Sequence, residues 1–360
     1  MKILFLPKHE YLAASTRYRT IQYLSYIKDK NIEFNVSPLF SDEYLKFKYE
    51  NGTENKLITL RRILKRIKII LFDAQQYELL VIEKELIPYF PPLLECYLKL
   101  KKIHFIVDYD DAIWHNYDNH RNFLVRVLLK NKIKIVMNQA DTIIAGSKYI
   151  VDYAKNTLCR NIVKIPTVID IKRYKCNETS IKETLFVIGW IGSPSTSQYI
   201  LDIDKMLKEF TDKHNAIVHL VGFDKALSSQ LHFKYRIVPW NESSEIDEIC
   251  KFSVGIMPLP DTPFERGKCG FKLIQYMGCK KAVIASPIGE NNIIVSHGVN
   301  GFLARDYDSW LEHLLFFYQN RLKGIEFGNQ GFNTVQQAYS LGVGQEKYYQ
   351  ALTSVDKEVL

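Results

Sequence analysis

Residues Glu265 to Lys272 place an acid, cations and two glycines between two apolar runs. The preceding run, "VGIMPLP", predicts the end of a strand, and the following "FKLIQYMG" predicts the first turns of a helix. Backbone N–H groups at the start of a helix and the positive end of its dipole favour a bound anion. Arg266 offers a planar fork and Lys272 a point charge, both suited to phosphate oxygens. The loop therefore predicts a phosphate site; the alternative is a solvated loop whose cations only aid solubility.

A chain of 360 residues exceeds the usual size of a single core, so two domains are expected. Its composition, 47% hydrophobic with 24% charged residues, is that of a globular protein and excludes a disordered one. The formal charge of +8 suits a partner that carries phosphate, and a nucleotide, a nucleic acid and an anionic lipid all do so.

The cysteines and the apolar segments indicate the compartment. Six cysteines show no CxxC pair and no spacing typical of secreted proteins, which predicts reduced thiols. The amino terminus has too short an apolar run for a signal peptide, and no stretch reaches the ~18 apolar residues of a membrane span. We therefore expect a cytoplasmic protein, at most peripheral on the inner face of a membrane.

Short apolar runs alternate with helix-length amphipathic segments, which predicts an α/β protein with doubly wound parallel sheets. The strands expected in the first half are 2–7, 32–39, 78–83, 104–109, 142–147 and 162–167. The pattern restarts with 183–193, 216–223, 235–240, 254–259, 281–287 and 301–304. We expect two Rossmann-like domains, 1–168 and 169–332, joined near residues 168–182 and facing a central cleft. A C-terminal helical segment, 333–360, follows, and the first domain is one candidate for its packing partner.

Segment 254–304, with "GIMPLP", "ERGKCGFKLIQYMGCKKAVIASPIGENN" and "VSHGVNGFLA", resembles the donor-binding part of the retaining glycosyltransferases of the GT-B fold, family 4 (glycosyl transferases group 1). "ADTIIAGSKYIVDYAK" followed by "NIVKIPTVIDIKRY" (140–174) is similar to the end of that family's first domain and its crossing to the second. "VIGWIGSPST" (187–196) resembles the glycine-containing turn that opens its second domain. The resemblance covers nearly the whole chain and is strongest from 140 to 304.

The resemblance implies that the second domain holds a nucleotide-diphosphate sugar. Arg266 and Lys272 would clamp the diphosphate, and the turn at Gly192 and Ser193 would approach it closely. The alternative for this turn is a tight connection from strand to helix. Glu265 matches the first glutamate of the family's glutamate pair, which contacts the donor sugar.

Gln275 occupies the position of the second glutamate of that pair, which holds the ribose hydroxyls in the family. An amide can both donate to and accept from a diol, so binding can survive with altered strength. "IGENN" (288–292) is similar to the loop beside the donor sugar, where Glu290 either contacts sugar hydroxyls or points into water. We expect the base to be read near Val238 and Trp240.

Two stretches of the first half resemble the acceptor side. In "STRYRT" (15–20), Arg17 or Arg19 either faces the cleft or serves as surface charge. In "VDYDDAIWHNY" (107–117), Asp110 would project into the cleft and orient the acceptor hydroxyl or accept its proton, at a place where many family members have a histidine. A plain helix cap is the alternative reading of Asp110.

Rival functions stay open. Asp108, Asp110, Asp111 and His115 could form a metal site, and the Asp108–Asp110 motif resembles that of metal-dependent glycosyltransferases of the other fold, which lacks a second Rossmann half. A non-catalytic nucleotide-sugar-binding subunit is another candidate, because a glutamine replaces the second glutamate. A nicotinamide-dependent oxidoreductase is disfavoured, because the first strand is not followed by GxGxxG.

Residues 56–72 predict a basic amphipathic helix. Ile63, Ile67, Ile70 and Leu71 share one helical face. The segment has no acid and carries the cations Lys56, Arg61, Arg62, Lys65, Arg66 and Lys68. This composition is typical of binding to an anionic membrane surface; the alternative is a core helix with a solvated basic face. We expect no nucleic-acid partner, because no aromatic stacking platform accompanies the cations.

These patterns lead to one expected activity. We expect a retaining hexosyltransferase that moves a sugar from a UDP- or GDP-sugar to a hydroxyl of a lipid-linked or cell-surface glycan, as in polysaccharide biosynthesis. No obligatory metal or other cofactor is expected.

Overall fold

The computed structural model describes residues 1–51, 56–176 and 185–355. The chain divides into two compact units. The first unit comprises Met1–Thr167, Gly267–Cys269 and the chain from Gly344, and the second comprises Val168–Arg266 and Gly270–Val343. Of the predicted junction and C-terminal segment, residues 177–182 and 356–360 lie outside the described residues.

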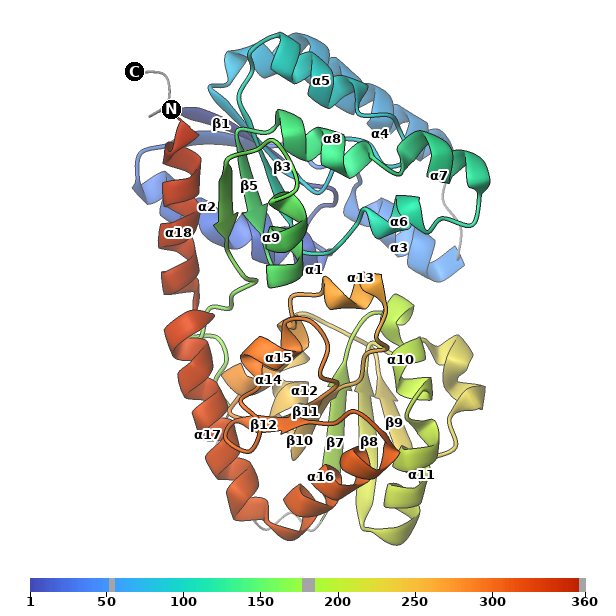
Figure 1. Ribbon diagram of the computed structural model, residues 1–360. Coiled ribbons are helices and arrows are strands. Elements are labelled where there is room, and N and C mark those ends of the chain that lie inside the picture. The colour runs from blue at the N-terminus through green and yellow to red at the C-terminus, as the bar shows by residue number, and fades with distance from the viewer. Residues whose placement is uncertain (52–55, 177–184, 356–360) are drawn as a thin grey trace. The chain divides into compact units, whose positions relative to one another are not determined.

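The first unit is built on a six-stranded parallel sheet of order β2-β1-β3-β4-β5-β6 (Figure 1). Its strands are β1 (Lys2–Leu6), β2 (Glu33–Val36), β3 (Leu79–Glu83), β4 (Phe105–Tyr109), β5 (Thr142–Ala145) and β6 (Asn161–Lys164). The central strands are near-continuous apolar runs, "LLVIE" and "FIVDY", because helices bury both faces of a parallel sheet.

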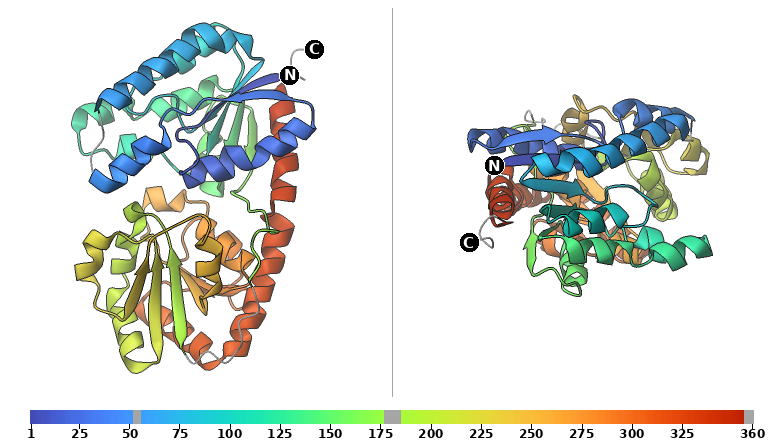
Figure 2. Two further views of the ribbon diagram at one scale, coloured as in Figure 1. Left: turned by 180° about the vertical axis from the view of Figure 1, so that it is seen from behind. Right: turned by 90° about the horizontal axis from the view of Figure 1, so that it is seen from above.

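Helices cover both faces of this sheet (Figure 2). The helices of residues 1–167 are α1 (Ala14–Thr16), η1 (Arg17–Ile21), α2 (Gln22–Asp29), α3 (Asp42–Asn51), α4 (Lys56–Lys68), η2 (Ile69–Asp73), η3 (Ala74–Gln76), α5 (Leu93–Leu100), α6 (His115–Asp118), α7 (Phe123–Leu129), α8 (Lys132–Gln139) and α9 (Lys148–Ala154). Ile70, Leu98 and Val136 bring α4–η2, α5 and α8 into one core with Leu80, Phe105 and other strand residues.

The last helix, α18 (Leu341–Thr353), enters the first unit from Gly344 onward. Its Tyr348 ring stacks on Tyr23 of α2, with 4.3 Å between ring centroids. The Tyr26 hydroxyl donates to Glu346 at 2.6 Å. Offset aromatic stacking of this kind adds to area burial, so α18 is an integral part of this unit's core.

The second unit repeats the architecture with a parallel sheet of order β12-β11-β10-β7-β8-β9. Its strands are β7 (Phe186–Ile191), β8 (Ala216–Val221), β9 (Tyr235–Val238), β10 (Val254–Met257), β11 (Ala282–Ala285) and β12 (Gly301–Leu303). Its helices are η4 (Pro194–Thr196), α10 (Gln198–Leu201), α11 (Asp204–Lys213), η5 (Lys225–Gln230), α12 (Glu245–Cys250), α13 (Pro263–Arg266), α14 (Phe271–Gly278), α15 (Asn291–Ile294), α16 (Tyr307–Gln319) and α17 (Arg321–Ala338). The predicted doubly wound fold of both halves is confirmed.

Glycines let two elements lie against α14. A Cβ at Gly331 of α17 would meet Met277, and one at Gly278 would meet Ile169 and Tyr174 of the crossing segment, residues 168–176. Close packing without a side chain thus fixes both neighbours on this short helix.

The expectation of reduced thiols is wrong for one pair. Cys176, in the crossing segment, forms a disulfide with Cys250 at the end of α12. Their separation of 74 residues follows no recognisable motif, so the sequence carried no sign of the pairing. Cys279 lies beside them and stays a free thiol.

Loss of this disulfide should destabilise the second unit. Cys250→Ser in metal-free buffer should lower the free energy of unfolding by about 2–4 kcal/mol, because the cross-link closes a long loop and restricts the unfolded chain. Urea unfolding followed by tryptophan fluorescence measures this, with Cys96→Ser as the matched control. A midpoint equal to that of the wild-type protein would contradict the prediction.

Candidate functional site

The second unit has its topological switch point between β7 and β10. The chain proceeds from β7 to β8 and β9 on one side of the sheet, and to β10, β11 and β12 on the other. Ligands of open parallel sheets bind at the carboxyl ends of the strands at such a point. The turn after β7, with Gly192 and Ser193, and the loop after β10, with residues 258–270, both start there.

The turn after β7 has no room for a side chain. A Cβ on Gly192 would strike the Trp190 indole, and a Cβ on Gly222, where φ is +75°, would strike the Gly192 carbonyl. Gly192 N–H donates to Val221 at 2.9 Å. Ser193 forms a capping box with Thr196 and so starts η4. The backbone of this turn is therefore open to close approach by a ligand.

Lys272 meets the same indole from the other loop. It is the second residue of α14, whose preceding Gly270 has the left-handed φ of +67°. Its Nζ lies 5.5 Å from the centroid of the Trp190 ring, a cation–π arrangement. Trp190 thus brings together the Gly192 turn and a cation at the start of a helix.

Arg266 ends the short helix α13 and is half exposed. Its Nε and Nη2 donate to the two carboxylate oxygens of Asp261, at 2.6 and 3.1 Å. These hydrogen bonds lower the pKa of Asp261. An exposed ion pair contributes little net stability, so a more highly charged anion can compete for this guanidinium. The backbone at Gly289, where φ is +53°, packs directly on the Arg266 carbonyl.

Glu265 is buried and held by two hydroxyls. Tyr199 donates to its Oε1 at 2.5 Å, and Thr262 donates to its Oε2. Both carboxylate oxygens are therefore oriented before any ligand arrives. This arrangement suits a hydrogen-bond acceptor of fixed direction.

Gln275 and Glu290 are also buried. The Gln275 amide donates to the Tyr174 hydroxyl at 3.2 Å, so its nitrogen is engaged with the crossing segment. Glu290 precedes α15, and its carbonyl accepts from Ile293 and Ile294.

Val238 and Trp240 follow the same sheet edge. Gly222 N–H donates to the Val238 carbonyl at 2.8 Å. The Trp240 indole N–H donates to Glu245 at 2.9 Å. Both residues thus adjoin the Gly222 turn, which itself packs on Gly192.

Arg19 is not a surface charge, which was one of the two roles considered for it. It is buried in the first unit, where it forms a bidentate ion pair with Asp108 and donates to Ile165 at 2.8 Å. Burial alone would lower the pKa of Arg19, but Asp108 raises it. The reason for the difference is this buried partner, 89 residues away in the sequence.

Arg17 and Asp110 lie at the carboxyl edge of the first sheet. Arg17 donates to the carbonyls of Tyr11 and Leu12 in the loop after β1. Asp110, just after β4, pairs with Lys84 at 2.9 Å. Lys84 follows β3, has a φ of +66°, and also lies 3.5 Å from Asp111.

Within the described residues, the side chains of the alternative metal site, Asp108, Asp110, Asp111 and His115, do not form a group with the spacing of metal ligands. Asp108 is paired with Arg19, and Asp110 with Lys84. His115 bonds Asp118 at 2.9 Å and Tyr149 at 3.0 Å. With their charges compensated by cations, the two carboxylates are poor ligands for a divalent ion.

The sequence reasoning missed Glu83, the last residue of β3. The first unit's switch point lies between β1 and β3. Glu83 is 2% exposed, Thr16 Oγ1 lies 3.3 Å from its Oε2, and its Oε1 has no hydrogen-bond partner among the described residues. Burial raises the pKa of Glu83 to about 7. The sequence signal that could have indicated this residue is a glutamate directly after the apolar run "LLVI".

Arg66 was predicted on a basic face but is buried. Its Nη2 donates to Pro7 at 3.1 Å and Ser37 at 2.8 Å, and its Nη1 has no hydrogen-bond partner within the described part of the chain. Burial lowers the pKa of Arg66 to about 9, against the opposing charge of Glu83. The edge of the first sheet therefore holds an unsatisfied acid and an unsatisfied donor.

Residues 56–72 form α4 and most of η2, and they present two apolar faces. Ile63, Ile67 and Ile70 pack in the core. Leu57, Leu60 and Leu64 form a second stripe that is more than half exposed. No helix among the described residues has the length and apolarity required to cross a membrane.

Helix α7 carries a similar surface that the sequence reasoning did not single out. Phe123, Leu124, Val127 and Leu128 are 51–74% exposed. Residues 119–140 around them contain no acid and include Arg121, Arg126 and Lys130. Such an exposed apolar face bordered by cations marks an interaction surface.

Comparison with known proteins agrees with this geometry. Residues 183–320 match the family model described as glycosyl transferases group 1. No curated protein sequence matches the chain.

Solved structures extend the likeness to the whole chain. Anabaena Alr3699/HepE in complex with UDP-glucose has a TM-score of 0.71 at 15% identity, covering 98% of this chain and 100% of its own. Sucrose-phosphate synthase from Thermosynechococcus elongatus has a TM-score of 0.70 at 13% identity, with 99% and 100% covered. The lipopolysaccharide outer core galactosyltransferase WaaB has a TM-score of 0.65 at 12% identity, with 98% and 99% covered. Residues 183–320 thus match the model of the glycosyl transferases group 1 family, and the whole chain has the GT-B fold of these structures, with two Rossmann-like domains.

Proposed function

We propose that this protein is a retaining glycosyltransferase that transfers a hexose from a UDP- or GDP-sugar to a hydroxyl acceptor. The observation that carries the proposal is the meeting of Gly192 and Lys272 on the Trp190 ring, at the switch point of the second unit. A side-chain-free turn and a cation at a helix start are the parts that a diphosphate requires. Alr3699/HepE, which shares the fold, has been solved with UDP-glucose and makes UDP the first donor to test.

The chemical step follows from charge. As the glycosidic bond breaks, negative charge builds on the leaving diphosphate, and Lys272, Arg266 and the start of α14 would stabilise it. Arg266 would exchange Asp261 for phosphate oxygens. The acceptor oxygen would attack from the side of the leaving group, so no protein nucleophile is needed.

Within the same unit, Glu265 would receive hydrogen bonds from the donor sugar, because Tyr199 and Thr262 already orient its carboxylate. Gln275 would contact the ribose through its amide oxygen, since its nitrogen is bonded to Tyr174. Glu290 would line the sugar, and Val238 and Trp240 the base.

We assign the acceptor side to the carboxyl edge of the first sheet. Asp110 is paired with Lys84, whereas Glu83 has a pKa near neutrality and a carboxylate oxygen, Oε1, that lacks a geometric hydrogen bond within the described part of the chain. A base with such a pKa can accept the acceptor hydroxyl's proton at working pH. Arg17 would border the same edge. No obligatory metal is proposed, because cations of the protein already compensate Asp108 and Asp110.

The acceptor is proposed to be a lipid-linked or cell-surface glycan, with the protein peripheral on an anionic membrane. The exposed stripes of α4 and α7 would insert their apolar side chains among lipids, while Arg61, Arg121 and Lys130 would meet anionic headgroups. WaaB, a lipopolysaccharide galactosyltransferase, shares the fold.

Removal of the two donor cations should strongly weaken diphosphate binding. Arg266→Ala with Lys272→Ala should weaken UDP or GDP binding by roughly a hundredfold, because charge-assisted hydrogen bonds are worth about 1.5–3 kcal/mol each. Calorimetry measures this, with Lys208→Ala and Lys323→Ala removing two exposed cations elsewhere in the unit. Unchanged affinity in the first variant would refute the donor assignment. Sugar transfer to a panel of acceptors separates an enzyme from a non-catalytic binding subunit.

Glu83 should make stability pH-dependent. Its pKa is about 7 in the folded protein against an ordinary 4.5, so between these values the folded state holds a proton that the unfolded state has lost. Wild-type stability should therefore fall as pH rises through this window. From pH 5 to pH 8, Glu83→Gln should gain up to about 3 kcal/mol relative to wild type in urea unfolding.

The control for this titration is Glu33→Gln, which changes an exposed glutamate of the same unit. A difference between Glu83→Gln and wild type that does not vary with pH would rule out the shifted titration. As the proposed base, Glu83→Gln should also lose sugar transfer while keeping UDP affinity.

The exposed face of α7 should govern vesicle binding. Phe123→Ser with Leu128→Ser should reduce co-sedimentation with phosphatidylglycerol vesicles at least tenfold, since each apolar side chain contributes about 2 kcal/mol when buried. Leu322→Ser with Ile325→Ser, on an exposed face of the second unit, is the matched control. Equal sedimentation of both variants would argue against this surface.

A further inference from the structure

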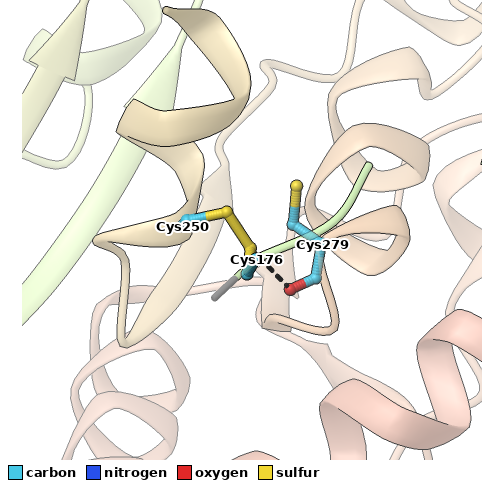
Figure 3. A group of neighbouring side chains, drawn as sticks. All are labelled: Cys176, Cys250 and Cys279. Carbon is cyan, nitrogen blue, oxygen red and sulfur yellow. Dashed lines mark hydrogen bonds between the residues drawn. A yellow bond between two sulfur atoms is a disulfide. The ribbon is translucent and has the colours of Figure 1, made fainter. Parts of the chain in front are cut away.

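Three sulfur atoms gather in the second unit, far along the chain from one another. Cys176 comes from the crossing segment, Cys250 from the end of α12, and Cys279 from the residue after α14 (Figure 3). All three Sγ atoms lie within 4.8 Å of one another. Among the described residues, this is the group of cysteine, histidine and acidic side chains whose spacing suits a shared metal ion.

The surroundings of the sulfurs are open and cationic. A cavity of about 730 Å³ is lined by all three cysteines together with Lys175, Lys251, Lys280 and Lys281. Lys281 Nζ donates to the Cys250 carbonyl at 2.5 Å, which holds one of these cations beside the cluster. A small cation and water can therefore reach the sulfurs.

We propose that, when the Cys176–Cys250 disulfide is reduced, the three cysteines bind one thiophilic divalent cation, with Zn²⁺ as the probe. Zn–S bonds of about 2.3 Å in tetrahedral geometry set the sulfurs about 3.8 Å apart. The Sγ atoms of Cys176 and Cys250 would separate to that distance. The distances from the Cys279 Sγ to these two atoms would stay the same or become shorter. The fourth position faces the cavity and takes water.

Charge and protons balance in this state. Three thiols lose three protons to become thiolates, and with Zn²⁺ the centre carries a net charge of −1. Lys175, Lys280 and Lys281 of the cavity would compensate that charge, whereas Lys251 is already paired with Glu248 at 2.6 Å. The Cys176 Sγ lies 3.5 Å from the Cys279 carbonyl, a contact that can become an S–H···O bond only in the reduced state, before metal arrives.

Disulfide and metal are thus alternative occupants of the same sulfurs. A phosphine reductant takes the oxygen of one water to become phosphine oxide, and it leaves the two cysteines as thiols. Either state ties the crossing segment to α12, and only the metal state also recruits Cys279.

Metal binding by the full-length protein tests the proposal. Wild-type protein reduced with a phosphine and passed through a desalting column should retain one Zn²⁺ per chain, whereas the oxidised protein should retain none. Co²⁺ should give thiolate-to-cobalt charge-transfer absorption only after reduction. Cys279→Ser should lower zinc affinity by at least roughly a hundredfold in chelator competition, more than the loss of an outer-shell partner would.

Cys96→Ser and Cys159→Ser remove free thiols of the first unit and should leave zinc binding unchanged. Retention of zinc by Cys279→Ser equal to wild type would overturn the three-sulfur site. So would absence of binding by the reduced wild-type protein, which involves no substitution and hence no risk of misfolding.

Discussion

The Trp190 ring is the contact on which the second unit's sheet edge depends. The ring is buried on the central strand β7. Residues from two loops, one on each side of the switch point, contact it. Gly192 has no side chain because the indole fills that space, and Lys272 rests its ammonium over the ring. An aromatic ring attracts a cation through its quadrupole and, unlike a carboxylate, does not neutralise the charge.

The first unit follows the opposite principle and buries its charges. Arg19 pairs with Asp108, and Lys132 pairs with Glu85 at 2.5 Å, both inside the unit. Breaking such a pair leaves an uncompensated charge away from water, which costs far more than the pair gains. These pairs connect β4 to η1 and the segment after β3 to α8.

Much of the fold could be predicted, because parallel strands that are buried on both faces appear in the sequence as continuous apolar runs. The positions of Gly192 after β7 and of Arg266 and Lys272 after β10 were also predictable, because apolar strand runs precede them in the sequence. The burial of Arg19 could not be predicted, because it depends on an ion pair with Asp108, which is distant along the chain. The same holds for Cys176 and Cys250, which meet only after the sheet has formed. For Glu83, the sequence shows a glutamate at the end of a strand. It does not show that the side chain is buried or that Oε1 lacks a hydrogen-bond partner among the described residues.

Helix α14 lies between the two proposed sites, the diphosphate site at Lys272 and the metal site at Cys279. Its eight residues span about 12 Å, two turns with Lys272 at one end and Cys279 just beyond the other. Gly278 seats the crossing segment against it, and Gln275 bonds to Tyr174 of that segment. Helix α14 therefore connects Lys272 at its start to the three cysteines beyond its end. The oxidation state of the cysteines and the proposed binding of a nucleotide would then be coupled through this helix.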